Sequence, residues 1–139
     1  MLTPRTVDYL ETIYLLSRRQ DTVGVSQVAA ERGVTIPTAR AAVRKLKDAG
    51  HVRQERYGKI VLTQKGVTRA ATVYRTHTVL YRFLHDVLGV AAERADAEAC
   101  RLEHGLSPDT LSRLIDFLNE HPELAEPVAT AQPEGREEW

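Results

Sequence analysis

The sequence predicts a mainly α-helical protein, in which three short helices and a two-stranded hairpin precede a second helical unit. Apolar residues recur every three or four positions through most of the chain, which is the spacing of one face of an α-helix. The exception is the stretch 51–62, where two short runs suited to strands flank a turn. A length of 139 residues suits either one compact unit or a small head followed by a small second half.

The first three helices are predicted from residues that cap a helix or end it. Ser and Thr side chains accept the unbonded amides of a first turn, proline suits that turn, and glycine ends a helix. Helix, glycine-containing turn and helix within 24 residues, 27–50, is the arrangement of a helix-turn-helix. The expected caps are Thr3 for a helix over 4–19, Ser26 for a helix over 27–32 and Thr35 for a third helix that ends at Gly50.

A hairpin and three further helices are predicted in the rest of the chain. Residues 51–55 and 59–62 are expected to be strands around a tip at Arg56-Tyr57-Gly58. Thr63 is expected to cap a long helix over 64–88, which Gly89 ends, and shorter helices are expected over 93–105 and 108–119. The predicted domains are 1–63, 64–119 and a tail over 120–139, rich in Pro, Glu and Ala, that docks loosely or is disordered.

Residues 1–63 match a winged helix-turn-helix, in which the third helix enters the major groove of DNA and the hairpin is the wing. Arg40 is the candidate for a bidentate contact to guanine, and Thr38 and Ala39 are short enough to touch a thymine methyl. Thr35 and Thr38 are able to donate to phosphate at the start of this helix. The predicted DNA-binding residues are Thr35, Pro37, Thr38, Ala39, Arg40, Arg44, Lys45, Arg56, Tyr57 and Lys59.

The charge distribution also indicates one DNA-facing end, although the formal net charge is zero, with 19 Lys and Arg against 19 Asp and Glu. Residues 18–69 hold 12 basic and four acidic side chains, whereas residues 90–139 hold four basic and 12 acidic ones. This asymmetry is typical of a chain with a nucleic-acid-binding end. Ordinary solvated helix faces are the alternative explanation.

Two short spacings and one histidine suggest a metal site. Side chains three or four residues apart share one face of a helix, and carboxylate, imidazole and thiolate groups bind metals. Each group also has an ordinary explanation, as a solvated carboxylate, a core histidine or a small buried cysteine, and spacing alone does not bring three helices together. The residues concerned are Asp8 and Glu11 in the first helix, His77 in the long helix, and Cys100, Glu103 and His104 in the helix over 93–105.

Five sequence blocks within residues 4–119 match one known family, in the same order along the chain. They are Asp8-Tyr-Leu-Glu-Thr-Ile-Tyr14, Val34-Thr-Ile-Pro-Thr38, Leu62-Thr-Gln-Lys-Gly66, His77, and Glu98-Ala-Cys-Arg-Leu-Glu-His104 with Leu106-Ser107. Together they resemble the diphtheria-toxin-repressor / manganese-transport-regulator family of metal-dependent transcriptional repressors. The resemblance implies a homodimer whose winged helix-turn-helix binds double-stranded operator DNA, expected to be palindromic. It also implies a helical dimerisation domain, metal bridging the two domains, and a short two-domain form without the family's SH3-like domain.

The same resemblance implies which side chains bind the metal. Cys100 stands where the manganese branch has a glutamate and the iron branch a cysteine, whereas Asp8 follows the manganese branch. Tyr81 and Asp96 stand where the second site of the iron branch has a carboxylate and an imidazole. The expected cofactor is therefore Fe(II) or Mn(II), for which Zn(II), Co(II) or Ni(II) substitute in vitro. The candidates that match the manganese branch are Asp8, Glu11, His77, Glu103 and His104.

The remaining features limit the function classes. One cysteine excludes an internal disulfide framework. The absence of an apolar run of about 18 residues and of a signal-peptide pattern predicts a cytoplasmic protein with no membrane partner. A catalytic His-Glu-x-x-His pair, nucleophile elbow and phosphate-binding glycine loop are all absent, so no enzyme is expected. The alternatives are a winged-helix regulator switched by a small organic ligand, a metallohydrolase and a protein-interaction module.

Overall fold

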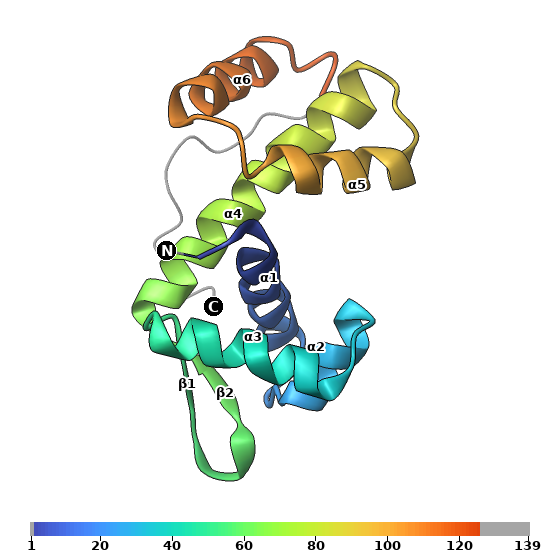
Figure 1. The fold of residues 1–139 in the computed structure, drawn as a ribbon. Helices are drawn as coiled ribbons and strands as arrows, with labels where there is room; N and C mark the ends of the chain where they lie inside the picture. The colour runs from blue at the N-terminus through green and yellow to red at the C-terminus, as the bar shows by residue number, and fades with distance from the viewer. Residues whose placement is uncertain (1, 126–139) are drawn as a thin grey trace. The chain divides into compact units, whose positions relative to one another are not determined.

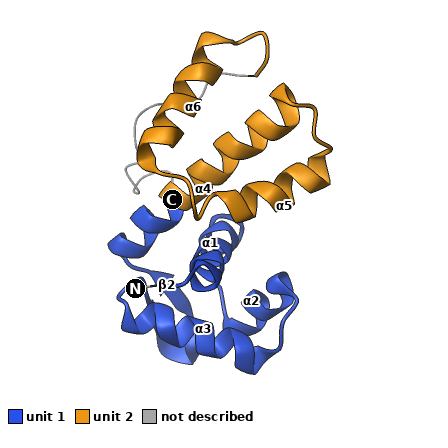
Figure 2. Ribbon diagram, turned by 45° about the horizontal axis from the view of Figure 1, so that its top comes forward, with its two compact units in different colours: residues 1–71, 133–139 blue, residues 72–132 orange. Residues whose placement is uncertain are grey.

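The computed structural model describes residues 2–125, which belong to two compact units (Figures 1 and 2). Unit 1 contains residues up to Ala71 and unit 2 begins at Thr72. The predicted fold class is confirmed, and no helix of the described part is long and apolar enough to span a membrane. The elements are α1 (Pro4–Arg19), α2 (Val25–Arg32), α3 (Ile36–Asp48), β1 (Val52–Gln54), a 3-10 turn (Arg56–Gly58), β2 (Ile60–Leu62), α4 (Gln64–Arg82), a π-helical turn (Phe83–Val87), α5 (Ala92–Leu102) and α6 (Pro108–Glu120).

Side-chain caps set the beginnings of the first three helices. Thr3 and Thr35 cap α1 and α3 as predicted, and each hydroxyl oxygen accepts the amide three residues on, at 3.2 and 3.3 Å. The predicted cap at Ser26 is wrong, because Gly24 is the N-cap of α2 and its amide donates to the side-chain oxygen of Gln27 at 2.6 Å. Gln27 is thus the third residue of the helix and its side chain reaches back to the amide of the N-cap, so the helix begins at Val25, before the predicted cap.

The core of unit 1 forms where α1 packs against α2 and α3. Burying each large apolar side chain stabilises the fold by about 1.5–3 kcal/mol, so this cluster fixes the relative positions of the helix-turn-helix elements. The recurrence of apolar residues every three or four positions therefore predicted that α1 buries one face. The most completely buried side chains are Leu10, Ile13, Tyr14, Val23, Val28, Val43 and Leu46.

The wing is an antiparallel hairpin in which Val52 pairs with Leu62 and Gln54 with Ile60. Each strand is shorter than predicted, because the ladder gives way to a tip at Tyr57 and Gly58, whose φ angles of 65° and 77° lie in the left-handed region. Such angles suit a tight hairpin turn. The amide of Ile60 donates to the carbonyl of Val23 at 2.8 Å, which ties the wing to the segment before α2.

The beginning of α4 packs within unit 1. Thr63 caps the helix as predicted, and its hydroxyl oxygen accepts the amide of Gly66 at 3.1 Å. Lys65 Nζ donates to the carbonyl of Ala49 at 2.9 Å, and Ala70 and Ala71 are buried. For this reason the boundary between the compact units falls inside α4, later than the predicted division after residue 63.

Unit 2 has its own core, in which Val79 of α4 packs with Ile115 and Leu118 of α6 and with Ala125. The long helix ends at Gly89 as predicted, after the π-helical turn. The burial of Ala125 extends the packed region beyond the predicted boundary at residue 119, and the rest of the predicted tail, 126–139, lies outside the described residues. The helix predicted over 93–105 ends earlier, since α5 closes at Leu102 and a turn follows.

Candidate DNA interface and metal centre

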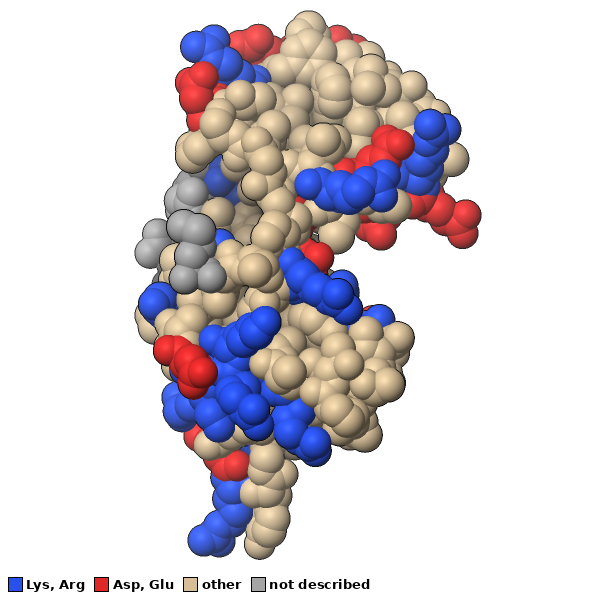
Figure 3. All heavy atoms as spheres, in the orientation of Figure 1, with Lys and Arg blue, Asp and Glu red and all other residues tan. Residues whose placement is uncertain are grey.

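The exposed face of α3 is strongly basic. Arg40, Arg44 and Lys45 are all exposed, and Figure 3 shows Lys and Arg side chains gathered over α3 and the hairpin. Within residues 2–125, none of these three cations takes part in an ion pair; the ion pairs of unit 1 join other arginines to Glu31, Asp8 and Glu55. Their charge is therefore available to a polyanion, as a DNA-facing helix requires.

One predicted DNA-binding residue is not on this face. Ala39 has no exposed surface, because it lies on the inward stripe of α3 with Ala42, Val43 and Leu46. The predicted contact of Ala39 with a thymine methyl is therefore wrong. The exposed apolar residue at this end of the helix is Ile36, whose exposed fraction is 43%, and which the sequence pattern did not single out.

The beginning of α3 presents Thr35, Pro37 and Thr38 to solvent, as predicted. Besides capping the helix, Thr35 donates its hydroxyl hydrogen to the hydroxyl oxygen of Thr38 at 2.9 Å. A hydroxyl has one hydrogen to donate, so Thr35 is fully occupied in the cap. Thr38 is the acceptor in this pair, so its own hydroxyl hydrogen can still be donated to a phosphate or base.

At the wing, the structure separates the exposed side chains from those held by neighbours. Tyr57 is 97% exposed, and the guanidinium of Arg56 lies 6.0 Å from the centre of its ring. Lys59 is half-buried, and Arg53 pairs with Glu55 at 3.0 Å. The hairpin tip therefore offers mainly one aromatic ring and one arginine.

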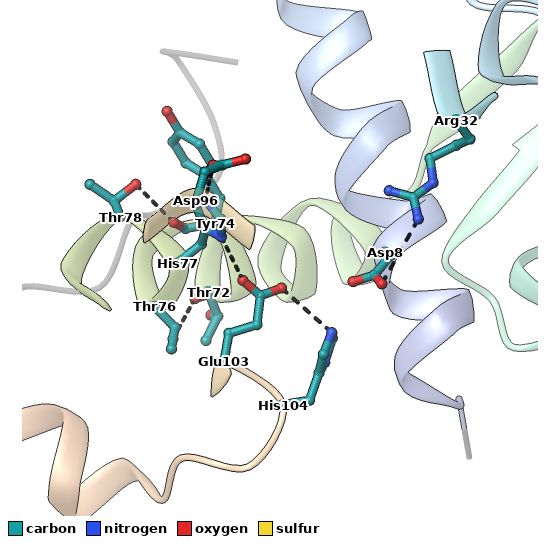
Figure 4. Close-up of polar contacts among 10 residues, drawn as sticks. All are labelled: Asp8, Arg32, Thr72, Tyr74, Thr76, His77, Thr78, Asp96, Glu103 and His104. Atoms are coloured by element: carbon teal, nitrogen blue, oxygen red, sulfur yellow. Dashed lines mark hydrogen bonds and ion pairs between the residues drawn. The ribbon is translucent and has the colours of Figure 1, made fainter. Parts of the chain in front are cut away.

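Unit 1 holds two of the predicted metal ligands. Asp8 and Glu11 are half-buried and one helical turn apart on α1. Asp8 Oδ2 lies 4.0 Å from a guanidinium nitrogen of Arg32 on α2 (Figure 4). That guanidinium also lies 5.3 Å from the ring centre of Tyr9. A cation from the protein itself thus already faces one predicted ligand.

Unit 2 brings together three of the other predicted ligands, since His77 and His104 both lie beside the buried carboxylate of Glu103 (Figure 4). The side chain of Glu103 is only 1% exposed, with Oε1 at 3.0 Å from His77 Nδ1 and Oε2 at 3.6 Å from His104 Nε2. No described residue gives Oε2 a hydrogen bond. A carboxylate this deeply buried needs positive charge or donors around it. Cys100, one turn earlier on α5, is half-buried.

Asp96 completes this cluster, although the sequence pattern marked it only as a departure from a family ligand. Its Oδ1 lies 2.9 Å from His77 Nε2, so both ring nitrogens of His77 face carboxylates. A neutral imidazole has one N–H, so both contacts are hydrogen bonds only when the ring carries two protons. Asp96 and Glu103 are two helical turns apart, a spacing that could have indicated their common face. Tyr81, by contrast, stacks on His85 at 5.4 Å between ring centres.

The donor atoms in each unit suit a divalent transition metal. Carboxylate oxygens favour Mn(II), and imidazole nitrogens together with a thiolate favour Fe(II) and the later metals. Glu103 Oε2 is buried and has no hydrogen-bond donor among the described residues, with His104 Nε2 at 3.6 Å, and this supports a cation beside it. The predicted ligands of the two units therefore fit the Fe(II) or Mn(II) that the sequence predicts.

Comparison with protein families matches both halves of the chain. Residues 1–60 match the model described as iron dependent repressor, N-terminal DNA binding domain. Residues 63–127 match the one described as iron dependent repressor, metal binding and dimerisation domain. The two matches cover nearly all of the described residues.

Three relatives illustrate the range of similarity. An uncharacterised HTH-type transcriptional regulator of Methanocaldococcus jannaschii is 34% identical over 80% of this chain and 90% of its own length. The iron-dependent repressor IdeR of Mycobacterium tuberculosis is 36% identical over 85% of this chain but only 51% of its own length. The regulator MntR of Lysinibacillus sphaericus is 29% identical over 95% of this chain and 96% of its own length.

Comparison with solved structures also finds metal-dependent regulators. The manganese regulator SloR superposes with a TM-score of 0.77 at 35% identity, over 85% of this chain and 55% of its own. A manganese-dependent transcriptional repressor in complex with manganese gives 0.70 at 30% identity, over 88% and 53%. The chain thus spans about half the length of these structures and of the mycobacterial repressor.

Proposed function

The chain belongs to the iron-dependent repressor family, and from this premise we propose that it is a homodimeric repressor whose operator binding depends on Fe(II) or Mn(II). Family membership confirms the prediction of a metal-dependent DNA-binding regulator that is not an enzyme. The observation that carries the proposal is the buried Glu103 carboxylate between two imidazoles, in a chain whose other unit presents unpaired cations on α3.

We propose that α3 reads bases through Arg40, with Thr38 and Arg44 on flanking phosphates and with Tyr57 of the wing on the backbone or minor groove. Exposed Ile36 takes the apolar contact that had been predicted for Ala39, because a thymine methyl needs an accessible apolar partner. In a homodimer two such helices would enter successive major grooves about 34 Å apart, so the operator is expected to be palindromic. A protein that acts on operator DNA is expected in the cytoplasm.

The proposed metal ligands come from both units. A bound divalent cation supplies the positive charge that these carboxylates require. Because Asp8 and Glu11 belong to the DNA-binding unit, metal ligation through them would restrict the movement of that unit and favour the spacing that DNA requires. The proposed ligands are Asp8, Glu11, His77, Cys100, Glu103 and His104.

A selection experiment tests the proposal and determines the operator. Duplexes bound by the full chain are selected from a random pool under anaerobic conditions, with Fe(II) and Mn(II) in parallel. Their affinity is then measured with and without metal. We expect either metal to raise the affinity by about 5- to 150-fold, the usual range of coupling between two sites.

Glu103→Gln keeps the size of the side chain and removes its charge, and it is expected to abolish this metal effect. Glu98→Gln is the matched control, since Glu98 lies on the same helix and pairs with Arg94 at 3.3 Å instead. Unchanged metal stimulation in the Glu103→Gln variant would contradict the proposal.

A further inference from the structure

A groove of about 470 Å³ runs between the first turn of α1 and the exposed face of α3, wholly within unit 1. Helix α1 is not part of the helix-turn-helix pair, so nothing in the sequence pattern assigned its first turn to DNA. The polar and helix-starting residues of the lining are Thr3, Arg5 and Thr6 from α1, and Pro37, Thr38 and Lys45 from α3.

The groove is positively charged. Arg5 and Lys45 face it from opposite helices, both are exposed, and neither forms an ion pair with any residue in the described range. The lining contains no acidic side chain. Two cations and the exposed hydroxyl of Thr38, without a neutralising carboxylate, make a site for an anion with several oxygen atoms.

The ends of the two helices add little to this charge. Pro4 and Pro37 have no N–H, and the hydroxyls of Thr3 and Thr35 already accept one amide each. Few backbone amides therefore remain to bind an anion at either helix end. Recognition must come from the side chains, which makes it testable by substitution.

We propose that this groove binds one phosphate group of the DNA backbone, clamped between Arg5 of α1 and Lys45 of α3. The inference rests on the proposed DNA-binding function and adds α1 to the DNA interface. Pro37 and Thr38 line the groove and lie at the start of the helix that we propose to read bases, so a phosphate in the groove would belong to the DNA that α3 reads. A phosphate contact of this kind fixes the register of the protein on the duplex.

The test is the salt dependence of binding, measured with the full chain, Mn(II) and a random-sequence 30-bp duplex. Arg5→Gln and Lys45→Gln are each expected to weaken binding and to reduce the slope of log K against log salt. The slope should fall by about 0.9 for each phosphate that the protein no longer neutralises, and by about twice that for a dimer. Because the two side chains share one phosphate, the double variant should reduce the slope by no more than the value for one phosphate per subunit, about 0.9. Arg19→Gln at the far end of α1, where Arg19 pairs with Glu31 at 3.4 Å, is the control and should leave the slope unchanged.

Three results would overturn the inference. Arg5→Gln could behave like the Arg19→Gln control, or the double variant could reduce the slope by more than one phosphate per subunit, which would indicate two separate phosphates. Thirdly, calorimetry could show that the DNA-free protein binds inorganic phosphate and that Arg5→Gln abolishes this binding without changing the DNA slope, which would assign the groove to a free anion. If the proposed function itself fails, the unsubstituted protein will show no metal-dependent binding of DNA.

Discussion

Gly66→Ala is expected to damage unit 1 severely, although it adds a single methyl group. Gly66 is buried in the first turn of α4, against the backbone of His51 at the start of the wing. A Cβ at this position would overlap the carbonyl oxygen of His51 and lie 3.3 Å from its Cα. Backbone atoms cannot relieve the overlap by a side-chain rotation, so α4 would have to move away from the wing.

The magnitude follows from three contributions. Forcing a group into a packed site costs about 1–3 kcal/mol. The carbonyl of His51 also accepts the amide of Thr63 at 3.1 Å, and straining that hydrogen bond costs up to about 1 kcal/mol. The higher helix propensity of alanine offsets about 1 kcal/mol of this destabilisation. The net destabilisation is about 2 kcal/mol, which lowers Tm by about 8–16 °C for a unit of 60–100 residues.

Thermal and guanidinium unfolding, followed by circular dichroism, measure this effect. Gly105→Ala is the matched control, because its Cβ would meet nothing within 4 Å and its φ is not in the left-handed region. That variant should unfold within about 0.5 kcal/mol of the unsubstituted protein. A Tm for Gly66→Ala equal to that of Gly105→Ala would refute the packing argument.

Three further predictions concern His51, Arg32 and Tyr57. Burial, followed by two cationic side chains of α4, lowers the pKa of His51 below its ordinary value of 6.5. The unfolded chain therefore binds the proton more readily, so the free energy of unfolding has its full value above pH 6.5 and falls as the pH drops below it. In His51→Gln the unfolding midpoints should depend less on pH. Arg32→Gln removes the cation that faces Asp8 at 4.0 Å. Calorimetry should then show that the affinity for Mn(II) rises by up to about fivefold, which corresponds to the interaction energy of a partly exposed ion pair. Arg19→Gln should not change this affinity. Tyr57→Gly relieves a φ of 65°, which costs an L-residue about 1–2 kcal/mol, against about 0.5–1 kcal/mol of extra entropy loss for glycine, so it should stabilise the fold by about 0.5–1 kcal/mol while weakening binding to duplex DNA. Weakened folding would contradict the strain, and unchanged DNA affinity would exclude a functional reason for it.

Most of the fold could be predicted from the sequence because its signals are local. Thr3, Thr35 and Thr63 cap helices through their own first turns, and Gly89 ends one by adopting a positive φ. The error at Ser26 arose where two capping arrangements compete within a few residues. A glutamine side chain decides that competition, and the pattern of serine and glycine alone does not reveal it.

The site was less predictable, because its geometry depends on packing between elements. The faces of α1 and α5 followed from spacing, but the contact of Asp96 with His77 requires knowing how α4 and α5 lie in unit 2. Ala39 was misplaced because its helix has small residues on both its inward and outward faces, so side-chain size does not distinguish them. The groove beside Arg5 depends on how α1 crosses α3, which no short motif encodes.

Helix α1 unites the two proposals. Arg5 and Asp8 are three residues apart on α1, so the proposed phosphate contact and the first proposed metal ligand lie within one turn of the same rigid helix. Asp8 also faces Arg32 of α2, and Arg5 faces the groove beside Lys45 of α3, so the same turn of α1 contacts both helices of the helix-turn-helix. A ligand that holds Asp8 therefore restrains the helix that positions Arg5. Because coupling between sites is reciprocal, DNA bound in the groove should in turn favour metal binding at Asp8.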